Sequence, residues 1–310
     1  MEDRQVKVLL EQAEVQRRLG NFRSAIDLVQ RALAIDPDHA RAHAALAISL
    51  LAARRLPGAG IESRLALGLD ANDPYIHYVA AAVLRAERKL EDAWAHILVA
   101  LESDNADATT HVLGATIQVL RGDRPRAREL LLEALALDAS HCDALTELAR
   151  LELDAGDREG AKEHIELALK SDPSDRDAHV VAGFLALANG NDASAEEHAR
   201  FVLNQDATDE GGLRLWTAVK AKRSKLLGLW WRWNTYISMR DDHRQIAVLI
   251  GTFVLMRILI IVTDELGYEV ISRALAIGWL GFCAYTWYAP ELFRSWLKQE
   301  LGTVKLDPDF

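Results

Sequence analysis

Cysteine is scarce in this chain, which has two among its 310 residues. Cys142 and Cys283 are too far apart in the sequence, and in surroundings too different, to provide a disulfide framework or a cysteine-based zinc site. We therefore place the bulk of the chain in a reducing compartment. The first residues alternate charged and apolar side chains and lack the apolar core of a secretory signal, so we expect a cytoplasmic N-terminus.

Clustered basic charge is missing as well. The formal net charge is −10 at pH 7, whereas nucleic-acid binding needs grouped Lys and Arg to displace counterions, so we expect no nucleic-acid partner. The sequence has no glycine-rich phosphate loop and no HExxH, CxxC or GxSxG motif. These absences favour a protein that is not an enzyme, with no catalytic residues, no cofactor and no metal ion.

What the chain does contain is an internal repeat. Written in rows of 34 residues, the segment from Val6 to Asp209 aligns six times without a gap. Two columns hold a small residue in every row: Ala13, Ala47, Ala81, Ala115, Ala149 and Gly183, then Ala25, Ala59, Ala93, Ala127, Ala161 and Ala195. Small side chains at fixed positions let neighbouring helices approach closely. A third column is aspartate throughout: Asp36, Asp70, Asp104, Asp138, Asp172 and Asp206.

The period and these columns resemble the tetratricopeptide repeat family, whose unit is a helix-turn-helix of the same length. The residue at the end of the first helix of a unit is glycine in four rows: Gly20, Gly122, Gly156 and Gly190. The resemblance implies an all-α fold, a right-handed solenoid of αα-hairpins over residues 1–225. It would consist of six repeats (6–209) and a capping helix (210–225).

In this family the first helices of the units line a concave groove that binds peptides or proteins. The groove positions carried over to this sequence are Lys7, Arg17, Arg18, Arg41, Ile48, Tyr75, Tyr78, Arg85, Val112, Thr116, Arg150 and Phe184. The N-terminal half is basic and the C-terminal half more apolar, which predicts a peptide that is acidic at one end and apolar at the other. A groove filled by the protein's own segments stays an alternative. The family's clamp for chaperone tails is missing, because Leu10 and Glu14 replace its lysine and asparagine.

Histidine occupies the family's bulky fourth position in four rows: His43, His77, His111 and His179. Equivalent residues on successive repeats are separated by about the diameter of a helix, roughly 10 Å, which is too far for them to share a metal ion. We interpret these histidines as packing residues.

Residues 245–310 contain two long apolar runs. The first spans 246–263 and is interrupted by Arg257, and the second spans 270–289 and is interrupted by Arg273. Each run is long enough to cross a bilayer as a helix, and the acidic link DELGYE suits a tight hairpin. We predict a two-helix transmembrane hairpin with a short tail, in which both intramembrane arginines extend toward the link or pair with its carboxylates. A buried hairpin within a soluble protein is the alternative.

Before the first run, residues 226–244 predict an amphipathic helix at the membrane interface. The rings and basic groups suited to the headgroup region are Trp230, Trp231, Arg232, Trp233, Tyr236 and Arg240. Basic residues flank the two runs but are missing from the link, which predicts that the solenoid and the C-terminus face the cytoplasm. These features predict a membrane protein that has the lipid bilayer as one partner, and the Ala-, Leu- and Arg-rich residue usage points to the bacterial inner membrane.

Two functions fit this organisation. The first is a membrane-anchored scaffold or adaptor that binds a protein or peptide partner in the groove. The second is a membrane-perturbing or channel-like effector, whose hairpin forms homo-oligomers under the control of the repeats.

Overall fold

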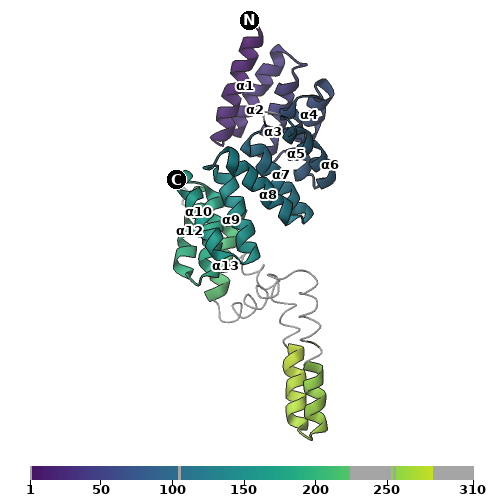
Figure 1. The fold of residues 1–310 in the computed structure, drawn as a ribbon, viewed down its shortest axis with the longest axis vertical. Coiled ribbons are helices and arrows are strands. Elements are labelled where there is room, and N and C mark those ends of the chain that lie inside the picture. Colours follow the sequence, from purple (N-terminus) through teal and green to yellow (C-terminus); the bar gives the residue numbers. More distant parts are fainter. Residues whose placement is uncertain (1, 104–105, 224–252, 254–255, 282–310) are drawn as a thin grey trace. The chain divides into compact units, whose positions relative to one another are not determined.

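The structure is a computed structural model that describes residues 2–103, 106–223, 253 and 256–281. Within these ranges all regular secondary structure is helical (Figure 1). The helices of the repeats are α1 (Glu2–Arg18), α2 (Phe22–Ile35), α3 (Ala40–Ala52), α4 (Leu56–Leu69), α5 (Pro74–Ala86), α6 (Leu90–Leu101), α7 (Ala108–Arg121), α8 (Arg124–Leu137), α9 (Cys142–Ala155), α10 (Arg158–Ser171), α11 (Arg176–Ala188), α12 (Asp192–Gln205) and α13 (Glu210–Arg223). Two further helices cover residues 256–265 and 269–281.

The helix starts reproduce the period found in the sequence. The first helices of successive units, from α3 to α13, begin 34 residues apart at Ala40, Pro74, Ala108, Cys142, Arg176 and Glu210. The second helices, α2 to α12, begin with the same spacing. The predicted all-α array of helix-turn-helix units is confirmed.

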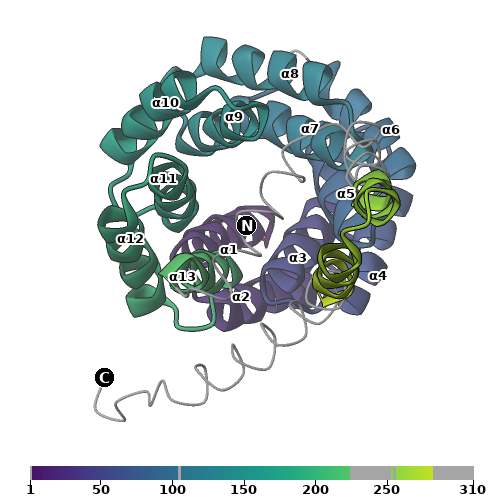
Figure 2. The same ribbon diagram turned by 90° about the horizontal axis from the view of Figure 1, so that it is seen from below.

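The chain divides into two compact units. The first comprises Met1–Leu151 and Glu163–Ser174, and the second comprises Glu152–Lys162 and Asp175–Phe310. In the first unit α1 packs on α2, α3 on α4, α5 on α6 and α7 on α8, and each pair packs on the next. Figure 2 shows α3, α5 and α7 on the inner side of the curve and α4, α6 and α8 on its outer side. We call the side formed by α1, α3, α5 and α7 the inner face.

Alanine forms the seams between these helices. The column that lies on the second helices has no exposed surface in any repeat: Ala25, Ala59, Ala93, Ala127, Ala161 and Ala195 are each 0% exposed. Leucines fill the layers beside these seams, as Leu130, Leu131 and Leu148 do beneath α7, α8 and α9. A larger side chain at a seam would force the backbones apart in a close-packed interior, so the columns are small in every row.

The aspartate column shapes the loop that follows each second helix. Asp70, Asp138 and Asp206 are the C-cap residues of α4, α8 and α12, and all three have an extended backbone. Their carboxylates accept a hydrogen bond from the N–H two residues further on, at 2.9 Å in each loop. This side-chain turn redirects the chain toward the next unit, which gives aspartate a reason to recur at this position.

Each first helix of the six repeats ends near a residue with left-handed backbone. Glycine supplies it in four repeats, for example Gly122 with φ of 87°. In the second and third repeats the equivalent residues are Arg54 and Arg88, with φ of 59° and 64°. Left-handed backbone costs a residue with a Cβ about 1–2 kcal/mol, so these two turns are strained relative to the glycine turns.

In the second unit α11 packs on α12, and α13 packs on both. Leu215, Ala218 and Val219 of α13 are buried in a cluster with Leu187, Ala195 and Ala199. The helix therefore covers apolar surface of the last repeat, as a capping helix does.

The helices of residues 256–265 and 269–281 form an antiparallel pair, which we call the hairpin. Gly267 lies in the turn between them, with φ of 80°. No helix within the described ranges is both long enough and apolar enough to cross a bilayer. The rest of the two apolar runs lies outside the described residues, as does the predicted interfacial helix (226–244).

The strained turns give a first prediction. Replacing Arg88 with glycine should raise the free energy of unfolding by about 1 kcal/mol, because glycine adopts left-handed backbone without a steric penalty. Urea unfolding of the full chain in detergent, followed by circular dichroism at 222 nm, measures the change. Gly122→Ala is the matched control and should lower the free energy of unfolding by a similar amount. A Cβ at this position meets no other atom within 4 Å, so the change reports the cost of left-handed backbone and not a steric clash with neighbours. Equal stability of all three proteins would contradict the strain.

Candidate functional site

The groove residues expected from the sequence all lie on first helices of the repeats. They are Lys7, Arg17 and Arg18 on α1, Arg41 and Ile48 on α3, Tyr75, Tyr78 and Arg85 on α5, Val112 and Thr116 on α7, Arg150 on α9 and Phe184 on α11. Arg17 of α1, Arg41 of α3 and the members on α5 lie near one another on the inner face of the first unit. They form the candidate binding site.

Two tyrosine rings lie at the centre of this site. Tyr75 and Tyr78 stack with their centroids 6.3 Å apart and their planes inclined by 19°. Residues three apart are neighbours on a helix surface, so both rings belong to one face of α5. Both are half-buried and pack on the core beneath α3 and α5. The pair offers a flat apolar surface that carries two hydroxyl groups.

Arginines from α1 and α3 lie beside these rings, and both are held by carboxylates. Arg17 donates to Glu14 through Nε and Nη2, at 2.9 and 2.7 Å. Arg41 donates from Nη2 to Asp73 Oδ1 at 3.2 Å, and its Nε donates to the other oxygen. Asp73 also caps α5 by accepting from the Tyr75 N–H at 2.9 Å. Arg41 is thereby fixed at the first turn of α5.

The electrostatics of the site keep the tyrosines neutral. Burial raises the pKa of the Tyr75 hydroxyl to about 12 and also raises the pKa of Tyr78. At Tyr75 the negative charge of Glu14 adds to the rise, whereas Arg17 and Arg41 oppose it. Both hydroxyls therefore stay protonated at neutral pH and can donate hydrogen bonds to an acidic ligand.

Other residues expected in the groove serve mainly packing. Val112 is 8% exposed and belongs to the core beneath α7, α8 and α9. Ile48 packs on the cores beneath α3 and α5, and the hydroxyl of Thr116 donates to the Leu113 carbonyl at 2.8 Å. Arg85 differs, because its buried Nε has no hydrogen-bond partner among the described residues. The Arg85 guanidinium group can therefore still donate hydrogen bonds to a ligand.

The remaining members lie on α1, α9 and α11. Lys7 and Arg18 of α1 are exposed, and Arg18 donates to Glu14 Oε1 at 2.9 Å. Arg150 Nη2 lies 3.7 Å from Glu147 Oε1 in the first unit. Phe184 packs on the core of α11, α12 and α13 in the second unit.

The histidines of the fourth position make specific contacts between the two helices of a unit. In the second repeat, His43 Nδ1 lies 2.7 Å from Glu62 Oε2. In the third and sixth repeats the partner is another histidine: His77 and His96 approach to 2.9 Å between their Nδ1 atoms, and so do His179 and His198. The packing role expected from the sequence is therefore joined by hydrogen bonds, which only the spatial pairing of the helices reveals.

The His77–His96 pair has a defined protonation pattern. His77 Nε2 lies 2.9 Å from the Ala71 carbonyl oxygen, which only accepts, so this nitrogen carries the proton. In neutral His77 the other nitrogen then accepts from His96 Nδ1–H. Burial, together with the nearby His77, lowers the pKa of His96, and burial also lowers the pKa of His198 in the sixth repeat. The neutral ring is thus favoured at His96 and at His198.

Metal binding finds no support in these clusters. Within the described ranges, no three side chains of His, Cys, Asp or Glu gather closely enough to hold a metal ion.

The residues predicted at the membrane interface, Trp230, Trp231, Arg232, Trp233, Tyr236 and Arg240, lie outside the described residues. Of the two predicted intramembrane arginines, Arg257 is exposed. Arg273 donates from Nη2 to Glu269 Oε2 at 2.9 Å, so it pairs with a carboxylate of the predicted acidic link.

Apolar side chains are exposed on both helices of the hairpin. Val270, Ile277 and Leu280 are 81%, 72% and 73% exposed, and Ile258 and Ile261 are 53% and 50% exposed. In contrast, Ser272 is buried and donates from its hydroxyl to the Ile260 carbonyl at 3.2 Å, which ties the two helices together. Such a surface is unfavourable in water.

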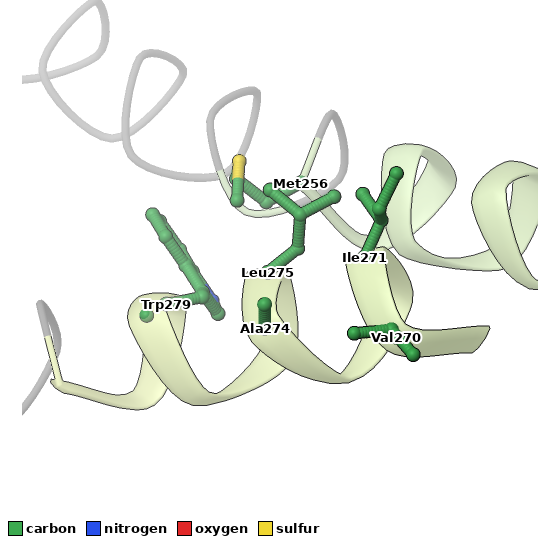
Figure 3. Close-up of a pocket in the computed structure, with 7 residues that line it drawn as sticks. Met256, Val270, Ile271, Ala274, Leu275 and Trp279 are labelled. Atoms are coloured by element: carbon green, nitrogen blue, oxygen red, sulfur yellow. The ribbon is translucent and has the colours of Figure 1, made fainter. Parts of the chain in front are cut away.

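One side of the hairpin is hollowed. Met256, Leu275 and Trp279 border an open apolar depression, in which Ala274 and Gly278 leave room between the larger side chains (Figure 3). Val270 and Ile271 complete its lining.

Comparison with known proteins identifies the repeats. A sequence model of the family described as tetratricopeptide repeat matches residues 10–75 and 146–209. Residues 10–75 and 146–209 carry tetratricopeptide repeats. The family resemblance noted in the sequence is thus confirmed. Proteins with the tetratricopeptide fold generally serve as scaffolds for protein–protein interaction and are generally not enzymes. A search among curated proteins found no match.

Solved structures of tetratricopeptide proteins share the fold. PilF of Pseudomonas aeruginosa is 18% identical, with a TM-score of 0.54 over 72% of this chain and 99% of that one. PilW, described as a widely conserved type IV pilus biogenesis factor, is 19% identical, with a TM-score of 0.55 over 68% and 97%. A thermophilic tetratricopeptide protein of Thermus thermophilus is 23% identical, with a TM-score of 0.53 over 59% and 99%.

The histidine pairs predict how stability depends on pH. Because the pKa of His96 is lowered in the folded protein, the unfolded chain binds a proton at this residue more readily once the pH falls below the ordinary histidine pKa of about 6.5. The free energy of unfolding therefore falls as the pH falls through that value. His96→Glu recreates the His43–Glu62 pairing of the second repeat, in which the histidine ring faces a carboxylate. Urea unfolding at pH 7.5 and 5.5 should show a loss on acidification that is smaller in this variant by about 1 kcal/mol. An equal loss in both proteins would show that the pair does not sense pH.

Proposed function

We propose that this protein is a membrane-anchored scaffold of the bacterial inner membrane, with its repeats and C-terminus on the cytoplasmic side. The repeats bind a segment of a partner protein on the inner face, and the region 245–310 inserts into the bilayer as a helical hairpin. Residues 226–244 lie along the interface and fix how the repeats stand on the membrane. The partner binds; no chemical step is carried out on it.

The observation that carries the membrane part is the exposed apolar surface of the hairpin. Leu280 and Val270 are among its most exposed side chains, and both would remove apolar area from water on entering lipid. The sequence continues the apolar runs on either side of the described helices, to lengths that suit a bilayer. Pairing of Arg273 with Glu269 lowers the cost of an arginine near the membrane.

The inner face of the first unit supports the binding part. It combines stacked tyrosines with arginines on α1, α3 and α5, and Tyr and Arg are enriched at the centres of protein interfaces. Arg17 and Arg41 are already paired with Glu14 and Asp73, whereas the tyrosine hydroxyls and Arg85 remain able to donate hydrogen bonds. An acidic partner segment is therefore favoured at these groups.

The second function considered, a channel-like effector, keeps one observation in its favour. The lining of the depression beside Trp279 includes two small residues, Ala274 and Gly278, and small residues let transmembrane helices approach one another. Such a surface would serve homo-oligomers of the hairpin.

Fractionation of cells tests the membrane anchor. The full chain should sediment with membranes and require detergent for release, whereas a chain ending at Lys225 should stay in the supernatant, because it lacks the apolar runs. A soluble full chain would show that the hairpin is buried within the protein or in a partner.

Replacing both Arg257 and Arg273 with leucine separates the two functions. An anchor should keep its membrane localisation and its partner, since leucine is favoured in lipid. A channel-like effector should lose its effect, which dye release from vesicles containing the purified full chain measures. Dye release by the parent protein and its loss in this variant would overturn the scaffold proposal.

A further inference from the structure

Arg85 is a half-buried arginine without a counter-ion among the described residues. Its Nε is buried and has no hydrogen-bond partner. Three other half-buried arginines each pair with a glutamate of their own helix: Arg17 with Glu14, Arg126 with Glu129 and Arg150 with Glu147. A partly desolvated guanidinium group without an acceptor is unfavourable, and an anion bound to its outer nitrogens, beside the buried Nε, would offset part of that cost.

The position of Arg85 connects it to the tyrosine pair. Tyr75, Tyr78 and Arg85 are three and seven residues apart in turn, so they lie along one face of α5. Between them Ala82 is buried, 4% exposed, in the core cluster on which Tyr78 packs. Burial is the main cause of the raised pKa of Tyr78, and the positive charge of Arg85 is among the influences that lower it. The Tyr78 hydroxyl and the Arg85 guanidinium group are therefore close enough to interact electrostatically.

Geometry limits what the anion can be. The planar guanidinium group binds carboxylates through paired hydrogen bonds, and the adjoining tyrosine rings favour an apolar side chain. Along α5, the rise from Tyr78 to Arg85 is about 10 Å at 1.5 Å per residue. An extended peptide covers that distance in about three residues at 3.3 Å each.

We propose that Arg85 anchors an aspartate or glutamate of the partner segment, and that an apolar or aromatic residue three positions away in that segment packs on Tyr75 and Tyr78. The assignment rests on the proposed binding at the inner face and makes it specific. It names the partner as an extended acidic segment, with the acid and the apolar residue at a fixed spacing.

Selection from a library of random dodecapeptides displayed on phage, with the full chain in detergent as bait, tests this assignment. Enriched peptides should share an Asp or Glu three positions from a large apolar residue. A synthetic peptide with the shared motif should lose at least tenfold in affinity on Asp→Asn, and as much when the bait is Arg85→Gln. Arg31→Gln, at an exposed position on α2, is the matched control and should bind like the parent. Circular dichroism of each bait checks that it is folded.

A charge exchange completes the experiment. Arg85→Glu should lose the acidic peptide and gain the same peptide with lysine in place of the acid, which a merely structural arginine would not produce. Peptides that depend on Tyr78 but not on Arg85 would leave inner-face binding in place and overturn the assignment of Arg85. Failure to enrich any peptide, or enrichment of peptides indifferent to Tyr78→Ala, would overturn both.

Discussion

The close approach of helices at the small-residue columns is the constraint on which the rest of the structure depends. Ala59 and Ala93 have no exposed surface, and Ala47 and Ala81 are equally buried on the first helices. With contact this close, each pair of helices packs on the next with the same geometry. Equivalent positions on successive first helices then fall side by side. The tyrosines, the arginines and the histidine pairs are placed by that repetition and not by local propensity alone.

Much of this fold follows from the sequence. The period, the alanine and aspartate columns and four glycine turns predict every first and second helix of the repeats, and the helix starts agree with that period. The two remaining turns show where pattern alone fails. Arg54 and Arg88 adopt left-handed backbone because packing of the helices on both sides requires it, and that tertiary requirement overrides the preference of the residue.

The candidate site was only partly predictable. Family positions place Tyr75, Tyr78 and Arg85 on one face, but they do not show which groove residues are buried or already paired with other side chains. Val112, taken as a surface position, is buried in the core. Arg41 pairs with Asp73, the N-cap residue of α5, a contact between residues 32 apart in sequence. Burial and pairing of this kind arise from the packing of separate repeats, so no short stretch of sequence contains them.

The proposed function requires the inner face of the first unit to receive a partner segment at the membrane. Photo-crosslinking in intact cells tests this requirement, with benzoylphenylalanine at position 78 on the inner face and, in a second protein, at the exposed position Leu132 on α8. We expect a discrete adduct with another polypeptide in the membrane fraction from position 78 and none from position 132. Adducts of equal yield from both positions, or an adduct from position 132 alone, would contradict it.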